Sequence, residues 1–183
     1  MKKYDAFISY RKSTAAYADL VYFSLVAEGI SKQRVFQDKH NIGSEQFDEK
    51  IKKAIEESNS LVLIVSKDCF VKKNDDDWFL KEIKVALDNN IPIIPILFDS
   101  VNSLTDPNII QSLKDNFTSK DVSYLIRQQY VRYDSDYSQS SLEKACTFVR
   151  QVLENEKLSW KEKMFKNVKL VASVSLIMLS CFC

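Results

Sequence analysis

Short apolar segments alternate with longer amphipathic ones along this chain, and no other feature constrains the fold as strongly. The plainest apolar segment, LVLIV at Leu61–Val65, has no polar face and predicts a strand buried on both sides. The other predicted strands are 4–10, 34–37, 91–98 and 129–133. The segments between and after them carry apolar residues at helical spacing, at 15–28, 44–55, 78–89 and 141–156. This order predicts an α/β fold, a flavodoxin-like three-layer sandwich around a five-stranded parallel sheet.

Two regions fit this pattern less well. In the strand IPIIPILF, Pro92 is tolerable near the start, whereas Pro95 predicts a bulge or an edge contact. Residues 102–120 are expected to be irregular, with one short helix near Ile109–Leu113.

Composition argues against two classes of function. Lysine and arginine total 26 and aspartate and glutamate 25, so there is no basic excess to indicate a nucleic-acid partner. The four cysteines and the single histidine, His40, do not form a zinc-binding spacing, and no metal site is expected. Scattered thiols and an N-terminus without an apolar leader favour a reducing compartment, the cytosol. The acidic run Asp75–Asp77 is interpreted as a solvated loop that caps the helix beginning near Trp78.

In a parallel α/β sheet, ligands bind beyond the carboxyl ends of the strands. That rule points to three segments, which are Ser9–Ser13, Asp38–Phe47 and Ser66–Glu82. Within the last segment, Trp78 and Glu82 are four residues apart and share one helical face.

Four stretches carry a family resemblance, in order and at family spacing. They are YDAFISYRKS, VFQDKHNIGSEQFDEKIKKAIEESNSLVLIVS, DDDWFLKEIKVAL and IPIIPILFD. Together they resemble the TIR (Toll/interleukin-1 receptor-like) domain over residues 4 to 155, and most closely its NAD-cleaving branch of the bacterial defence type.

The resemblance implies an NAD⁺ glycohydrolase, with NAD⁺ as substrate and no separate cofactor, that releases nicotinamide and ADP-ribose or a cyclic ADP-ribose. It implies that Glu82 is catalytic, and that Trp78, Arg11 and Phe47 bind substrate. The hydroxyl or backbone groups of Ser9 and Ser13 would add donors. Without the resemblance, each residue also has a plainer interpretation, as a solvated glutamate, a core tryptophan or a surface arginine.

The resemblance further implies activation by self-assembly in immune or antiphage signalling, as a homo-oligomer with contacts through the loop Asp38–Ser44. The alternative is a non-catalytic adaptor that works by TIR–TIR binding. A nucleoside deoxyribosyltransferase-like activity also stays open, since such enzymes use a glutamate. A receiver domain is set aside because the first strand ends in Ser9-Tyr10-Arg11 and not in paired acids.

The chain divides into a domain at 1–156, a lysine-rich segment at 157–169 and an apolar tail at 170–183. The tail is shorter than the roughly 20 residues of a spanning helix. Three interpretations stay open: a truncated transmembrane helix, a shallow membrane anchor, and a helix packed on the domain. The basic flank favours the first and would place the domain on the cytosolic side.

Overall fold

A computed structural model describes residues 2–37, 45–99 and 101–180, with side chains described for 2–37, 48–99 and 101–159. Five parallel strands form one sheet in the order β2-β1-β3-β4-β5. The strands are β1 (Ala6–Ser9), β2 (Val35–Gln37), β3 (Leu61–Val65), β4 (Ile93–Leu97) and β5 (Val131–Arg132). The predicted fold class is confirmed, and the order of the strands reverses between β1 and β3.

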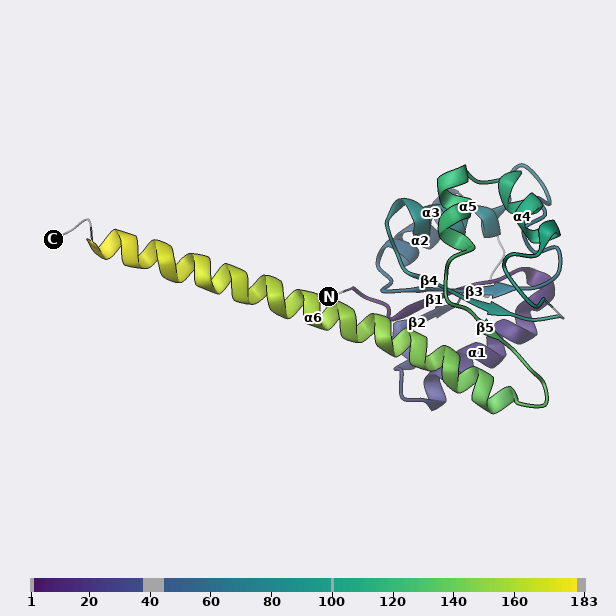
Figure 1. The fold of residues 1–183 in the computed structure, drawn as a ribbon, viewed down its shortest axis with the longest axis horizontal. Helices are drawn as coiled ribbons and strands as arrows, with labels where there is room; N and C mark the ends of the chain where they lie inside the picture. Colours follow the sequence, from purple (N-terminus) through teal and green to yellow (C-terminus); the bar gives the residue numbers. More distant parts are fainter. Residues whose placement is uncertain (1, 38–44, 100, 181–183) are drawn as a thin grey trace.

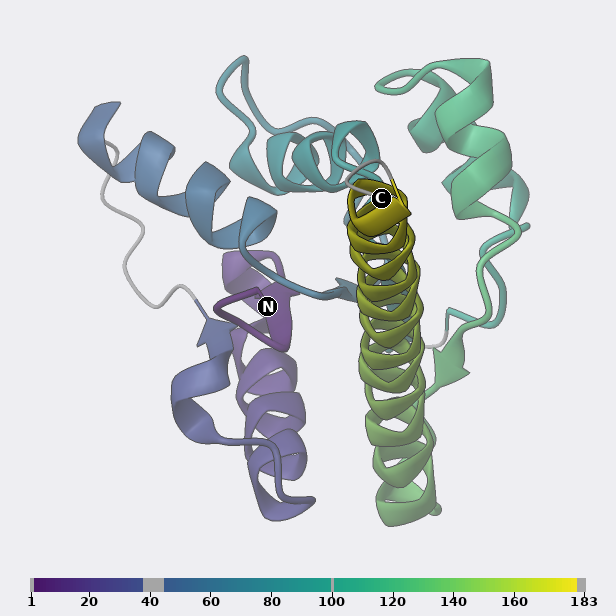
Figure 2. The same cartoon turned by 90° about the vertical axis from the view of Figure 1, so that its left-hand side faces the viewer.

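Helices cover both faces of the sheet, as Figures 1 and 2 show. One face packs on α1 (Ala15–Ala27) and on the first part of α6 (Ser138–Ser180). The opposite face packs on α2 (Glu45–Glu56), α3 (Trp78–Asp88), α4 (Pro107–Lys114) and α5 (Ser119–Leu125). The buried strand β3 divides its residues between the two cores, with Leu61, Leu63 and Val65 on one side and Val62 and Ile64 on the other. This explains why its sequence is apolar throughout.

Pro95 lies inside β4 and leaves its pairing with β3 continuous. The backbone groups that hydrogen-bond to β3 belong to even-numbered residues: the Pro92 carbonyl accepts from the Leu61 N–H, and the Phe98 N–H donates to the Val65 carbonyl. Odd-numbered positions face β5, where the Leu97 carbonyl accepts from Tyr133. The register with β5 begins only at Ile96. The N–H that Pro95 lacks would point to the β5 side of β4, at a position before the pairing with β5 begins. No hydrogen bond to β5 is lost there, so Pro95 behaves as at a sheet edge and needs no bulge.

The expectation of an irregular region at 102–120 is wrong in part. The short helix near Ile109–Leu113 is longer, as α4, and a second helix, α5, follows it. Both begin with a cap that the sequence contains: Asp106 accepts from the Asn108 N–H ahead of Pro107, and Thr118 accepts from the Asp121 N–H. The last strand is shorter than predicted, at Val131–Arg132.

The final helix continues well past its predicted end at 156. In Figure 1, α6 leaves the domain and extends as one helix to Ser180. In the part of the chain that the structure describes, no helix combines the length and apolar character that crossing a membrane requires.

Candidate functional site

The carboxyl end of β1 meets α3 at the point where the strand order reverses, which is where open α/β sheets bind ligands. Ser9, the last residue of β1, has 0% exposure. Its hydroxyl donates a 2.5 Å hydrogen bond to the Oε2 oxygen of Glu82. Glu82 is itself buried, with 9% exposure. Glutamate side chains are almost never fully buried unless they are paired, so the burial of Glu82 is unusual.

Helix α3 begins where it does because Asp77 caps it. The Asp77 side chain accepts from the Leu80 N–H, which satisfies one of the helix's free donors. Within α3, Trp78 and Glu82 are four residues apart and therefore lie on one face. The Trp78 ring is half-buried, and the ammonium group of Lys81 lies 4.6 Å from its centroid. The Lys81 ammonium group thus makes a cation–π contact with the ring.

Arg11 follows β1 and holds the loop between β3 and α3. Its Nη1 donates to Asp77 Oδ1 at 2.6 Å, its Nε to the Cys69 carbonyl at 2.8 Å and its Nη2 to the Val71 carbonyl at 3.1 Å. The guanidinium also stacks on the Phe79 ring, 4.5 Å from its centroid. The contacts of Arg11 therefore hold the loop between β3 and α3 and are structural. Its role as a phosphate ligand stays a prediction.

The acidic run before α3 has the capping role that the sequence predicts, through Asp77. Its two other members pair with lysines: Lys72 lowers the pKa of Asp75, and Lys81 lowers the pKa of Asp76. Among the described residues, no three histidine, cysteine, aspartate or glutamate side chains are grouped to hold a metal ion. What the sequence did not indicate is the ion pair between Asp77 and Arg11, residues 66 positions apart.

Two predicted substrate contacts remain, Ser13 and Phe47. Ser13 is exposed, in a 3-10 turn at Lys12–Thr14. The side chain of Phe47 and the loop 38–44, with His40, lie outside the described residues. Of the predicted residues, the structure joins Ser9 to Glu82 by a hydrogen bond, while Arg11 contacts Asp77 and Phe79 and Trp78 lies one helical turn before Glu82.

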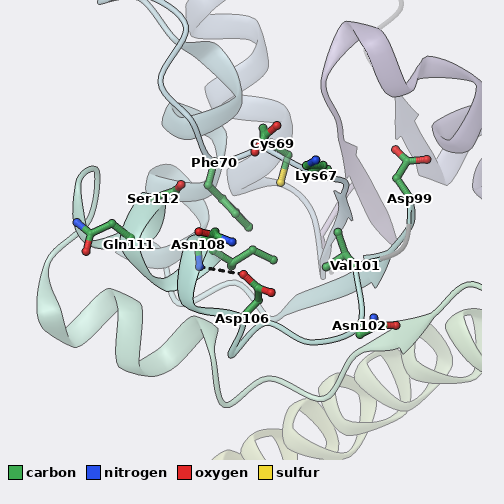
Figure 3. A pocket seen from close by; sticks show the side chains of 12 residues that line it. Lys67, Cys69, Phe70, Asp99, Val101, Asn102, Asp106, Asn108, Gln111 and Ser112 are labelled. Carbon is green, nitrogen blue, oxygen red and sulfur yellow. Dashed lines mark hydrogen bonds between the residues drawn. The ribbon is translucent and has the colours of Figure 1, made fainter.

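A separate cavity of about 560 Å³ opens beyond the ends of β3 and β4 (Figure 3). Ser9, Trp78 and Glu82 are not among its lining residues. The loop after β3 forms one wall, and α4 forms another. Cys69 lines the cavity but is almost fully buried, and burial raises the pKa of its thiol to about 12. A thiol in this state is a poor nucleophile near neutral pH, so Cys69 acts as a small buried apolar residue.

The sequence matches the family model described as "TIR domain" over residues 6–134. The chain is a member of the TIR domain family. Among curated proteins, this TIR domain is 27% identical over 158 residues to the "NAD(+) hydrolase SARM1" of Danio rerio, covering 84% of the chain and 20% of the relative. It is 28% identical over 166 residues to the "NAD(+) hydrolase tir-1" of Caenorhabditis elegans, covering 88% and 16%. The chain thus spans a fifth or less of the length of these two relatives.

Solved structures agree on the fold. The TIR domains of the activated Roq1 resistosome superpose with a TM-score of 0.51 at 17% identity, covering 83% of this chain and 98% of that one. A metazoan TIR-STING receptor from C. gigas, in complex with 2',3'-cGAMP, gives a TM-score of 0.50 at 16% identity, covering 78% and 39%. At these identities the likeness concerns the fold alone.

Proposed function

We propose that this TIR domain cleaves NAD⁺ at the bond between nicotinamide and ribose, with Glu82 as the catalytic carboxylate. The observation that supports the proposal most is the buried hydrogen bond between Ser9 and Glu82 at the point where the strand order reverses. A buried, hydrogen-bonded carboxylate at the edge where α/β sheets bind ligands is a candidate for chemistry. The two relatives described above carry the name NAD(+) hydrolase, which points to the same reaction.

The chemistry suits a single carboxylate. Nicotinamide leaves NAD⁺ as a neutral molecule, and the ribose that remains develops oxocarbenium character, as in glycoside hydrolysis. A carboxylate fixed beside the ribose stabilises that charge and holds the ribose hydroxyls. Ser9 holds one Glu82 oxygen, so the carboxylate does not have to be oriented when substrate binds. In this proposal the cationic nicotinamide takes the place of the Lys81 ammonium group on the ring of Trp78, one turn before Glu82.

The finer parts of the proposal rest on the sequence. The resemblance to the NAD-cleaving branch supports activation by self-assembly into a homo-oligomer, a role in immune or antiphage signalling, and a product that is either linear or cyclic ADP-ribose. Phe47, Ser13 and Arg11 would complete the substrate site. The lysine-rich segment 157–169 and the tail after it support a position of the domain at the cytosolic face of a membrane.

The test is nicotinamide release from NAD⁺ by the full chain, at high protein concentration and with a crowding agent to favour assembly. Glu82→Gln keeps the size of the side chain and an oxygen that accepts from Ser9, so the fold should survive while turnover is lost. Glu143→Gln, an exposed glutamate on α6, is the matched control and should stay active. Turnover retained by Glu82→Gln would remove Glu82 from the mechanism. No turnover by the unaltered chain under any assembling condition would favour the adaptor.

A further inference from the structure

The cavity beyond β3 and β4 has the size and build of a small-molecule site. Its volume of about 560 Å³ lies within the range of about 300–1,000 Å³ that is common for ligand pockets. It has an apolar floor, made by side chains that are each at most 9% exposed: Cys69, Phe70, Val101 and Ile109. Figure 3 shows Cys69 and Phe70 on one side of the hollow and Val101 and Asp106 across from them. A floor of this kind suits a flat or compact apolar group.

The rim of the cavity is acidic. Asp68, Asp99 and Asp106 line it, and Lys67 is the single basic residue among the lining residues described. The formal charge of the rim is therefore three negative charges against one positive. The other polar side chains of the rim are uncharged: Asn102, Asn108, Gln111 and Ser112. Such a rim attracts a cation and repels phosphates and carboxylates.

In two of the three rim aspartates, one carboxylate oxygen accepts a hydrogen bond from the protein. Asp99 Oδ1 accepts a 2.5 Å hydrogen bond from the Tyr17 hydroxyl, and Asp106 Oδ1 accepts a 2.8 Å bond from the Asn108 N–H. Among the residues that the structure describes, the second oxygen of each has no hydrogen-bond partner. These carboxylates are therefore held in place with an oxygen still able to accept from a ligand.

We propose that this cavity binds a small organic cation that carries an aromatic or compact apolar body, with the body on the floor of Phe70 and Ile109 and the charge at the aspartate rim. The site is distinct from the Ser9–Glu82 pair and does not depend on the function proposed for it. The sign of the rim's charge disfavours polyphosphate ligands such as NAD⁺ in this cavity.

Three ligands of one shape and different charge test the proposal: benzylammonium, benzyl alcohol and benzoate. Each is titrated into the full chain at low salt and followed by NMR chemical shifts. Benzylammonium should bind with a dissociation constant at least about tenfold lower than benzoate, because each exposed ion pair contributes a few-fold in affinity. Its affinity should fall as salt is added.

The triple variant Asp68→Asn, Asp99→Asn, Asp106→Asn removes the charge with little change of shape. Asp68 and Asp99 have φ of 59° and 52°, a left-handed conformation that asparagine adopts readily, and asparagine caps a helix as well as aspartate does. This variant should bind benzylammonium about tenfold more weakly than the unaltered chain, with an unchanged melting temperature. The matched control neutralises three exposed acids elsewhere, with Asp88→Asn, Asp136→Asn and Glu143→Gln, and should bind as before.

Glu82→Gln separates this cavity from the Ser9–Glu82 pair, and it should leave benzylammonium binding unchanged. The proposal is overturned if the three ligands bind equally, if benzylammonium does not bind, or if the cavity variant and the control lose the same affinity. Loss of benzylammonium binding in Glu82→Gln would also overturn it, by assigning the cation to the other site.

Discussion

The hydroxyl of Ser9 donates a 2.5 Å hydrogen bond to the carboxylate of Glu82, across 73 positions of sequence. One residue ends a central strand and the other lies on the second turn of a helix, so the bond joins the sheet to the layer that covers it. Both groups are buried. Ser9 therefore orients the carboxylate from inside the protein, a different role from the substrate contact that the sequence suggested.

If Glu82 is catalytic, Ser9→Ala should lower kcat by about tenfold or more, because a misplaced reacting group is costly to the rate. KM should change little, since Ser9 is not exposed to substrate. Ser60→Ala is the matched control: Ser60 is also fully buried, and its hydroxyl donates to the Asp5 carbonyl. Both variants should lose about 1 kcal/mol of unfolding free energy. Equal turnover in the two would show that Ser9 is only structural.

Arg11 and Asp77 form an ion pair whose side chains are 12% and 3% exposed. Replacing one partner leaves the other buried and uncompensated, so Arg11→Met should lower the free energy of unfolding by about 3–5 kcal/mol. Asp77→Asn should cost less, because asparagine still caps α3. Urea unfolding of both variants and of the double variant measures the coupling between the two residues, which should be favourable.

The competing role for Arg11 predicts another pattern. If the guanidinium binds a phosphate of NAD⁺, Arg11→Lys should raise KM under conditions where the fold is fully retained.

For the ion pair itself, an unchanged free energy of unfolding in Arg11→Met would show that the loop between β3 and α3 does not need it.

The alternation of strands and helices, and with it the parallel sheet, was predictable because each strand is a short apolar run between helical patterns. The rule that ligands bind at the carboxyl ends of parallel strands pointed to the segments Ser9–Ser13 and Ser66–Glu82. The family resemblance singled out Trp78 and Glu82 within the second segment. The contacts of Arg11 were not predictable, because a charged residue after a strand looks the same in sequence whether it faces solvent or a buried Asp77. Helix α5 was missed although Thr118 marks its start, since residues 102–120 lack a long apolar period. The cavity at the ends of β3 and β4 depends on two loops and α4, and no local pattern indicates it.

Gly29 follows Glu28, the C-cap of α1, with a φ of +91°, and a Cβ atom added at this position would meet no atom within 4 Å apart from its chain neighbours. Gly29→Ala should therefore lower the free energy of unfolding by about 1–2 kcal/mol through backbone strain alone, without a clash. Gly29→Asn should lose less, because asparagine tolerates a positive φ. Thermal melts of the two variants check the order, and an equal loss in both would point to a packing cause.

Two buried thiols make stability depend on alkaline pH. Burial raises the pKa of Cys69 from 9.0 to about 12 and that of Cys146 from 9.0 to about 11. The folded chain therefore keeps these protons at a pH where the unfolded chain loses them. Their stabilising contribution is complete below pH 9 and is lost as the pH rises toward 11 and 12.

For Cys69 the loss should approach about 1.4 kcal/mol per pH unit above the pKa of the unfolded thiol. Urea unfolding of the full chain on either side of that pKa measures the slope, and Cys69→Ala should flatten it. Lysines and tyrosines titrate in the same range, but they are common to both chains and cancel in the comparison. A constant offset between the two chains, with no difference in slope, would mean that substituting Cys69 only removes packing and that its thiol does not titrate on unfolding.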